Sequence, residues 1–366
     1  MDRAIALGAS DIHLTNGLKP MLRINGSLQE LEEFEVNNQE MLRTYTKEIT
    51  NDLQFQKFLE EKALDSSTTY IDTRFRVHIF RQREHDALVL RLIPTEIPDF
   101  DDMNLPEVVR SFTKVRNGLV LVTGVTGSGK STTLAAMIGE INKTQNKHIV
   151  TIEDPIEFVH EHNQSMVNQR EVGTDVDSFA DAVKAAMRED PDILLVGELR
   201  DLDTISNAIT MAETGHLVFG TLHTRSAAES IDRIIDVFPP GQQEQIRMQL
   251  ANSIAGIVAQ DLLVRKSGGR IPSCEVMIPS DAIRNNIRNP KGSNAFNTAI
   301  ENMSKEFGTQ TRIQALAQLF LQGEITQEVA TYGLNKEDEE NLINKIVAMR
   351  KGGATTGTNN RKGGKR

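Results

Sequence analysis

The feature that most constrains this chain is a glycine-rich segment that follows a short apolar run. Gly124-Val-Thr-Gly-Ser-Gly-Lys-Ser131 fits the pattern G-x4-G-K-[ST], and the apolar run Leu119–Thr123 before it is typical of a buried strand. Helical spacing follows over Thr132–Ile141. A strand, a glycine-rich turn and a helix N-terminus in this order form a loop whose backbone N–H groups surround phosphate oxygens. The chain is therefore expected to bind ATP.

The same segment supplies the side chains that a triphosphate requires. Lys130 provides a positive charge for the β- and γ-phosphates, and the Ser131 hydroxyl is the expected ligand for Mg²⁺. The residues predicted to contact the nucleotide are Gly124, Thr126, Gly127, Ser128, Gly129, Lys130, Ser131 and Thr132. The alternative is a glycine-rich turn with a structural role only, and the flanking strand and helix argue against it.

Apolar runs alternate with amphipathic helical stretches through the middle of the chain. The candidate strands are Leu119–Thr123, His148–Ile152, Ile193–Val196 and Leu217–Leu222. This alternation predicts a parallel sheet with helices on both faces. Ligands of such sheets bind at the carboxyl ends of the strands, so polar residues that follow these strands are expected to share one site.

Two glutamates follow strands of this predicted sheet. Glu198 comes after the third strand and is the candidate general base that orients and activates water. An Asp often precedes such a glutamate, but here the residue is Gly197, so Mg²⁺ is expected to rest on Ser131 and water. Glu153, after the second strand, is a candidate to support Mg²⁺ or the attacking water. The alternatives are a solvated glutamate for Glu198, and a helix cap or loop salt bridge for Glu153.

Two histidines flank the fourth predicted strand. His216 precedes this strand and His223 follows it, and seven extended residues span roughly 23 Å. The two side chains therefore cannot both contact the same phosphate within a single subunit. His223 lies at the carboxyl end and is expected to sense the γ-phosphate, whereas His216 is expected to support structure or a subunit interface.

Arginines gather in the N-terminal part of the chain. Five of them fall within 18 residues: Arg74, Arg76, Arg81, Arg83 and Arg91. One interpretation is that some of them reach the phosphates of the nucleotide as arginine fingers. The alternative is a solvated basic face or a set of salt bridges at a domain interface.

Composition excludes several classes of protein. The net charge of −10, the absence of Trp and an aromatic content of 5% argue against a nucleic-acid partner. Cys274 is the only cysteine, which excludes intramolecular disulfides and multi-cysteine zinc sites. Without a signal peptide or an apolar run of about 20 residues, no transmembrane segment is predicted, and we expect the chain to remain inside the cell.

Changes in composition along the chain predict five segments. These are an N-terminal domain at 1–95, a linker at 96–110, an ATPase domain at 111–280, a helical region at 281–350 and a disordered basic tail at 351–366. Within the first segment, helical spacing runs from Asn38 to Lys62, and strands are expected at Ile12–Leu14, Met21–Ile24 and Phe75–Phe80. Helices are expected later at Asp281–Ile287, Arg312–Leu321 and Glu337–Met349.

Six segments of the chain together resemble the type II/IV secretion ATPases, over about residues 8 to 330. They are the glycine-rich loop, Thr151–Phe158, Asp190–Asp201, Thr214–Thr224, Ala9–Leu14 and Val167–Val172. The resemblance implies an α/β fold, with a RecA-like P-loop ATPase domain, an N-terminal PAS-like α+β domain and a C-terminal helical extension. It also implies a homohexamer, at the inner face of the cell membrane against a platform protein. Arg76 and Arg91 match positions where the family contacts phosphate.

Within this family the chain is most similar to the pilus-retraction branch. Ala282-Ile-Arg-Asn-Asn-Ile-Arg-Asn289 resembles a stretch of that branch, Ala-Ile-Arg-Asn-Leu-Ile-Arg-Glu, with departures at Asn286 and Asn289. The function implied is a hexameric motor that hydrolyses ATP to retract type IV pili in twitching motility. The alternatives are a pilus-assembly or type II secretion ATPase, a nucleic-acid translocase, and a nucleotide-dependent regulator without hydrolysis. Assembly and secretion relatives often carry a four-cysteine zinc insertion, which is missing here.

Overall fold

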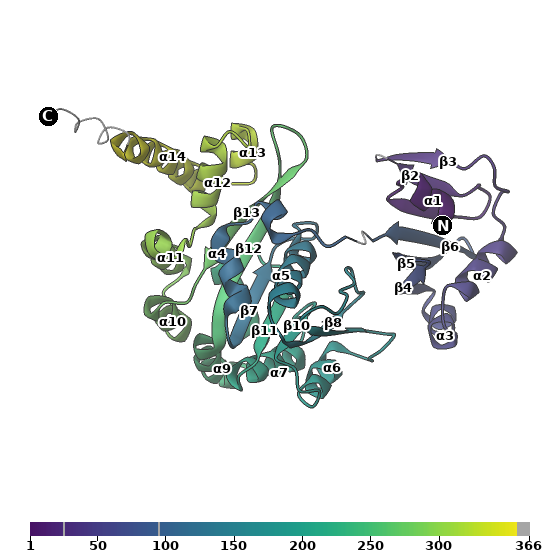
Figure 1. Ribbon diagram of the computed structural model, residues 1–366, viewed down its shortest axis with the longest axis horizontal. Coiled ribbons are helices and arrows are strands. Elements are labelled where there is room, and N and C mark those ends of the chain that lie inside the picture. The colour runs from purple at the N-terminus through teal and green to yellow at the C-terminus, as the bar shows by residue number, and fades with distance from the viewer. Residues whose placement is uncertain (25, 94–95, 357–366) are drawn as a thin grey trace. The chain divides into compact units, whose positions relative to one another are not determined.

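The computed structural model describes residues 1–24, 26–93 and 96–356, without the side chains of 351–356 (Figure 1). The chain forms two compact units. The first contains residues 1–97, 150–162 and 167–182, and the second contains residues 98–149, 163–166 and the chain from 183 onward. No helix among the described residues is both long and apolar enough to cross a membrane.

The N-terminal part of the first unit is a six-stranded sheet with the strand order β3-β2-β1-β6-β5-β4. Neighbouring strands are antiparallel. The strands are β1 (Asp11–Leu14), β2 (Met21–Ile24), β3 (Ser27–Glu30), β4 (Ala63–Tyr70), β5 (Thr73–Gln82) and β6 (His85–Leu92). The helices are α1 (Asp2–Ala6), α2 (Gln39–Glu48) and α3 (Asp52–Glu61). The three strands expected here are therefore confirmed, and β3, β4 and β6 are additional.

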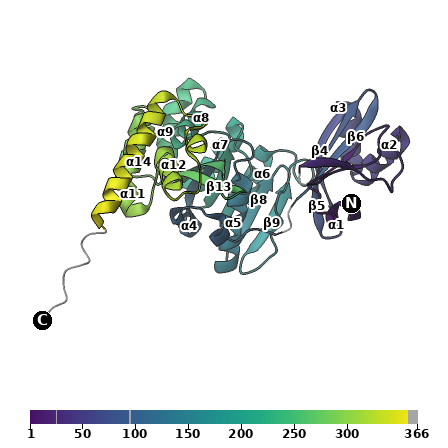
Figure 2. The same ribbon diagram turned by 90° about the horizontal axis from the view of Figure 1, so that it is seen from above.

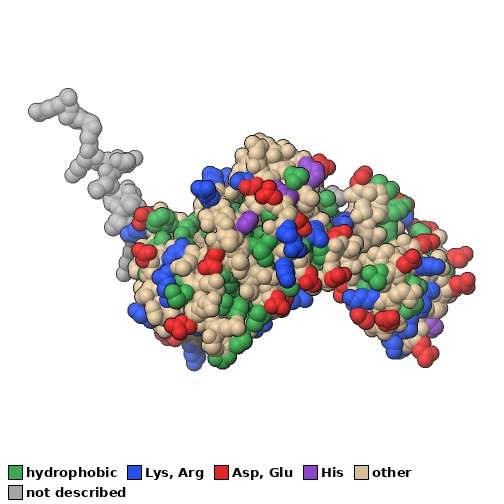
Figure 3. Space-filling view, turned by 90° about the horizontal axis from the view of Figure 1, so that it is seen from below, with side chains coloured by type: hydrophobic (Ala, Val, Ile, Leu, Met, Phe, Trp, Pro, Cys, Tyr) green, Lys and Arg blue, Asp and Glu red, His purple; other side chains and the backbone are tan. Residues whose placement is uncertain are grey.

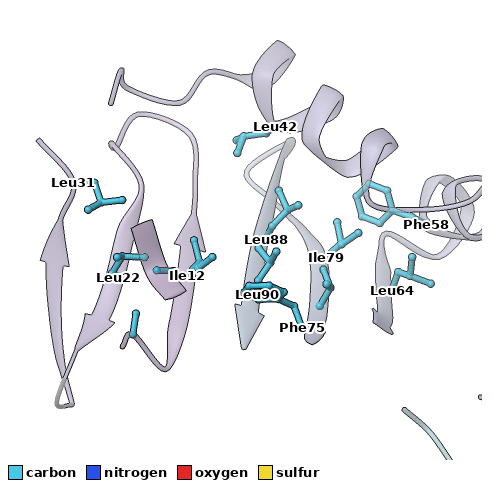
Figure 4. Close-up of a cluster of buried hydrophobic side chains, with 13 residues drawn as sticks. Ile12, Leu22, Leu31, Leu42, Phe58, Leu64, Phe75, Ile79, Leu88 and Leu90 are labelled. Atoms are coloured by element: carbon cyan, nitrogen blue, oxygen red, sulfur yellow. The ribbon is translucent and has the colours of Figure 1, made fainter. Parts of the chain in front are cut away.

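The core of this sheet forms on one face, under α2 and α3. Phe75, Val77 and Ile79 alternate along β5 and are each at most 1% exposed, because side chains two residues apart on a strand point to the same face. Leu42 of α2 and Phe58 of α3 point toward these strands (Figure 4). The apolar side chains of α2 and α3 thus pack against the apolar face of the strands.

The helical stretch from Asn38 to Lys62 is two helices rather than one. Asn51 interrupts it: its side chain accepts a hydrogen bond from the Gln54 N–H at 2.8 Å, and the Gln54 side chain accepts one from the Asn51 N–H at 3.0 Å. This reciprocal capping box begins α3 and satisfies backbone donors that a continuous helix would satisfy itself. The expectation of one helix was wrong because apolar residues keep helical spacing across the break.

The second sheet has seven strands in the order β13-β12-β7-β11-β10-β8-β9. They are β7 (Gly118–Thr123), β8 (His148–Glu153), β9 (Met166–Glu171), β10 (Ile193–Val196), β11 (Leu217–Leu222), β12 (Ile254–Val264) and β13 (Arg270–Met277). Every residue of β7, β10 and β11 is buried. Continuous apolar runs are typical of parallel strands covered on both faces, and the four predicted strands of this sheet are confirmed.

Helices and short 3₁₀ turns complete the chain. The 3₁₀ turns are η1 (Phe100–Met103) and η2 (Phe112–Lys114); the helices are α4 (Glu107–Ser111), α5 (Lys130–Thr144), α6 (Phe179–Ala186), α7 (Leu202–Glu213), α8 (Ala227–Asp236), α9 (Pro240–Ser253), α10 (Asp281–Arg288), α11 (Ser293–Phe307), α12 (Arg312–Leu321), α13 (Gln327–Thr331) and α14 (Lys336–Thr356). The helices α12 and α14 lie side by side (Figures 1 and 2). The predicted tail begins inside α14, and its residues 357–366 lie outside the described residues.

A buried carboxylate joins two of these helices to the edge strand β13. Glu275 is 5% exposed and accepts hydrogen bonds from the Ala227 N–H at 2.7 Å and the Arg312 N–H at 3.3 Å. These are the first residues of α8 and α12, whose backbone donors have no acceptor within the helix. Burial raises the pKa of Glu275, and the two N–H donors oppose that increase. One side chain therefore caps both helices.

Replacing Glu275 tests this double cap. Glu275→Ala leaves two buried N–H groups without acceptors, so we expect a loss of about 2 to 4 kcal/mol in the free energy of unfolding. Glu275→Gln keeps one acceptor oxygen and should lose less. Denaturant unfolding followed by circular dichroism measures both; equal stability of the wild type and the alanine variant would contradict the capping role.

Candidate functional site

Strand register brings three segments of the second unit together at the carboxyl end of β7. The last residue of β7 pairs with the last residue of β11 and with Ala259 of β12. The next residues along the three strands are Gly124, His223 and Gln260. The glycine-rich loop therefore starts between a histidine and a glutamine.

The adjacent strand β10 adds Glu198 to this edge. The Leu199 N–H donates to the carbonyl oxygen of Thr221 on β11, at 3.0 Å, so the pairing continues past the end of β10. Glu198 Oε1 lies 3.4 Å from His223 Nε2, and Glu198 Oε2 lies 2.7 Å from Arg200 Nη2. Two of the predicted residues, Glu198 and His223, are thus in contact.

Electrostatics keep Glu198 ionised. Burial raises the pKa of Glu198. The hydrogen bond and charge of Arg200, together with His223, lower this pKa by more than burial raises it, so the net shift is downward. A carboxylate that is charged at neutral pH can accept a proton from water. Arg200 was not predicted as a site residue, although its position two residues after Glu198 was visible in the sequence.

The backbone of the loop depends on glycine. Gly124, Gly127 and Gly129 have φ angles of 146°, 81° and 89°, a region that other residues rarely adopt. A Cβ atom on Gly124 would also lie 2.2 Å from the backbone oxygen of Gln260 and 2.5 Å from Ser128 Oγ. The glycine pattern is therefore a requirement of both conformation and space.

Polar groups in the loop fit a bound phosphate. Lys130 Nζ donates to the carbonyl oxygens of Gly124 at 2.8 Å and Val125 at 3.2 Å, so its ammonium group lies over the loop. Ser128 Oγ is buried and has no hydrogen-bond partner in the described part of the chain. An ammonium group and a buried hydroxyl beside the N-terminus of α5 are suited to the oxygens of a phosphate chain. Ser131 is half-buried in the first turn of α5. Its role as a ligand of Mg²⁺ stays a prediction.

The other predicted loop residues surround these groups. Thr126 is exposed at the tip of the loop, and Thr132 is half-buried in the first turn of α5. Their contacts with a nucleotide stay a prediction.

Glu153 is the last residue of β8 and belongs to the first unit. It accepts hydrogen bonds from Thr151 Oγ1 at 2.7 Å and Gln169 Nε2 at 3.1 Å. Burial raises the pKa of its carboxyl, and these hydrogen bonds oppose the shift. Its support of Mg²⁺ or water stays a prediction.

His216 lies at the opposite end of β11 from His223. Its Nδ1 is 3.0 Å from the carbonyl oxygen of Met211, near the end of α7. This contact joins the helix to the start of the strand, in keeping with the structural role expected of His216.

Arg76 and Arg91, the two arginines that match phosphate-contacting positions of the family, lie beside carboxylates of the first unit. Arg91 Nε lies 2.8 Å from Asp11 Oδ1, and its side chain is 67% exposed. Arg76 Nη1 lies 4.0 Å from Glu157 Oε1, also at an exposed position. These pairs agree with the salt-bridge alternative and leave a role at phosphate as a prediction.

Gly124 and Gly127 offer a matched test of the loop. Both have positive φ, but a Cβ atom on Gly127 would meet no atom within 4 Å, whereas one on Gly124 would collide with backbone. We expect Gly124→Ala to abolish nucleotide binding and Gly127→Ala to weaken it less than about tenfold, because only the first forces the loop to move. Titration with a fluorescent ATP analogue measures both affinities; equal affinities would show that close packing does not shape this loop.

Comparison with known proteins identifies the family of this chain. Residues 1–359 match the family described as Type II/IV secretion system protein. The chain is 45% identical to the type IV pilus retraction ATPase PilT of Pseudomonas aeruginosa, over 88% of this chain and 93% of that protein. It is 43% identical to a twitching motility protein of Neisseria gonorrhoeae, over 88% of each chain.

A solved structure shares the fold. The pilus retraction motor PilT with bound ADP superposes with a TM-score of 0.85 at 46% identity, over 93% of this chain and 97% of that one. The expected mixed α/β fold is therefore confirmed. The chain belongs to the type II/IV secretion system protein family.

Proposed function

We propose that this chain is a motor that hydrolyses ATP to retract type IV pili. The observation that carries the proposal is the contact between an ionised Glu198, which follows β10, and His223, which follows β11 beside the glycine-rich loop. Two relatives, at 45% and 43% identity, are a pilus retraction ATPase and a twitching motility protein, which supports retraction as the work performed.

Lys130 and the loop backbone bind the phosphates in this proposal. The ammonium group exchanges the carbonyl oxygens of Gly124 and Val125 for charged phosphate oxygens, which are stronger acceptors. N–H groups at the start of α5 point toward the same anion and stabilise it. The Ser131 hydroxyl would hold Mg²⁺, which would neutralise phosphate charge while the γ-phosphoryl group is transferred to water.

Glu198 orients the attacking water and accepts its proton. Arg200 and His223 hold the two carboxylate oxygens in different directions, so the carboxylate cannot rotate freely. A γ-phosphate would compete with Glu198 for the His223 imidazole, which gives His223 a means to sense it. Glu153 supports the water or Mg²⁺ in this proposal.

The remaining parts of the proposal come from the family resemblance. They are a PAS-like N-terminal domain, a RecA-like ATPase domain, assembly as a homohexamer and phosphate contacts by Arg76 and Arg91. The position at the cytoplasmic face of the membrane, against a platform protein, is proposed on the same basis. The six-stranded antiparallel sheet and the loop after a buried parallel strand support the two domain assignments.

The stretch typical of the retraction branch folds as α10. Arg284 Nη1 donates to the carbonyl oxygens of Ala251 and Asn252, the second at 3.1 Å, and Arg288 Nη2 donates to Asn252 Oδ1 at 2.8 Å. Both arginines therefore hold the last turn of α9. This arrangement favours retraction over assembly, because it uses residues that the chain shares with the retraction branch.

Glu198→Gln tests the catalytic part of the proposal. The amide cannot accept a proton from water, so ATP should still bind while hydrolysis slows by at least about 100-fold. Glu301→Gln is the control, because Glu301 is a half-exposed glutamate paired with Lys345, on α11. Steady-state phosphate release measures both variants. Near-normal turnover of Glu198→Gln in assembled protein would rule out its role as the base.

Deletion of the gene distinguishes retraction from assembly. A cell that loses a retraction motor should keep or accumulate surface pili but lose twitching, since filaments form and are not withdrawn. The wild-type chain should restore twitching and Lys130→Ala should not. Electron microscopy counts the pili; a bald deletion strain would assign the chain to assembly instead.

A further inference from the structure

A buried glutamine connects β12 to the glycine-rich loop. Gln260 is 3% exposed, and its Nε2 donates to the carbonyl oxygen of Ser128 at 2.7 Å. Its Oε1 accepts a hydrogen bond from Thr133 Oγ1, in the first turn of α5, at 2.8 Å. The two contacts lie on either side of Lys130 and Ser131 in the sequence. The side chain thus spans the segment that is proposed to hold the phosphates and Mg²⁺.

The contact with Ser128 determines the direction of a neighbouring N–H group. The carbonyl of Ser128 and the N–H of Gly129 belong to one planar trans peptide, in which the two groups point in opposite directions. Because Gln260 holds the carbonyl toward β12, the Gly129 N–H points away from β12. A loop of this kind binds phosphate through such N–H groups.

The same residue explains why two positions of the loop are glycine. A Cβ atom on Gly129 would lie 2.8 Å from Gln260 Nε2, and one on Gly124 would lie 2.2 Å from the Gln260 backbone oxygen. Side chain and backbone of Gln260 therefore pack directly against the loop. A shift of β12 at this residue changes the space available to both glycines.

The chemistry of the two contacts selects glutamine. The carbonyl oxygen of Ser128 accepts a hydrogen bond, and the hydroxyl of Thr133 donates one. An amide presents one donor and one acceptor on the same planar group, whereas an ionised glutamate has no donor and a lysine has no acceptor. The contacts are buried, so an unsatisfied partner costs free energy.

We propose that Gln260 is a positioning residue for phosphate binding, which sets the loop with the Gly129 N–H directed at the anion before the nucleotide arrives. The proposal rests on the proposed function, since it concerns the same nucleotide. Gln260 acts through the loop backbone and takes no part in the transfer of the phosphoryl group.

Gln260→Met tests the proposal with a side chain of similar length and no amide. We expect ADP affinity to fall at least about tenfold, the effect of one lost charge-assisted hydrogen bond. Gln310→Met is the matched control: Gln310 Nε2 also donates to a backbone carbonyl, that of Cys274 at 2.8 Å, but on β13. It should lose stability and keep ADP affinity within about twofold of the wild type.

Two further variants separate positioning from stability. Thr133→Val removes one contact of Gln260 and keeps the bond to Ser128, so ADP affinity should stay within about threefold. The double variant with Gln260→Met no longer buries an unpaired threonine hydroxyl. Its melting temperature should therefore exceed that of Gln260→Met alone, without recovery of ADP affinity. If Gln260→Met is recovered unfolded, Gln260→Asn, with its amide drawn back by one methylene, takes its place.

Isothermal titration with ADP and thermal melting decide between the outcomes. The proposal is overturned if folded Gln260→Met binds ADP within twofold of the wild type, or if Gln310→Met loses as much affinity. It is also overturned if affinity returns with melting temperature in the double variant. A wild-type chain that binds no ADP would instead refute the nucleotide function itself, so the two failures are distinguishable.

Discussion

The parallel pairing of β7 with β11 on one side and β12 on the other is the constraint on which the site depends. All six residues of β7 are buried, and hydrogen bonds to both neighbours fix its register. A slip of two residues in either pairing would move His223 or Gln260 away from Gly124. Strand register alone therefore places His223 and Gln260 beside the start of the loop. The pairing of β10 with β11 places Glu198 beside His223 in the same way.

Charged side chains of the site already have protein partners. Lys130 bonds to two neutral carbonyls, and Glu198 is paired with half-exposed or exposed side chains, Arg200 and His223. Charged phosphate oxygens are stronger acceptors than the neutral carbonyls of Gly124 and Val125, so they can replace these carbonyls at Lys130. Acidic and basic side chains are interspersed on the face of the molecule shown in Figure 3.

The sequence predicted the elements whose formation depends on residues close together in the chain. Buried parallel strands need continuous apolar runs, so β10 and β11 were predicted at their observed bounds, and the glycine-rich loop followed from its spacing. The edge strand β4 was missed because its sequence, Ala-Leu-Asp-Ser-Ser-Thr-Thr-Tyr, is mostly polar. A strand at the edge of a sheet has a neighbour on one side only, and its polar side chains can face solvent. Gln260 was missed for another reason: a single glutamine in an apolar strand has no motif, and its role follows only from register. Asn51 was a readable signal, since Asn-x-x-Gln is a capping box.

Helix α10, which carries the stretch typical of the retraction branch, contacts the end of α9, and the glycine-rich loop contacts β12, the strand that follows α9 directly. Helix α9 ends at Ser253 and β12 begins at Ile254 without a connecting loop. Arg284 binds carbonyls in the last turn of α9, which have no N–H partner within the helix, and a cation there is favoured by the helix dipole. Six residues after the start of β12, Gln260 holds Ser128. The departures at Asn286 and Asn289 leave Arg284 and Arg288 unchanged, and both arginines contact the last turn of α9 in this chain.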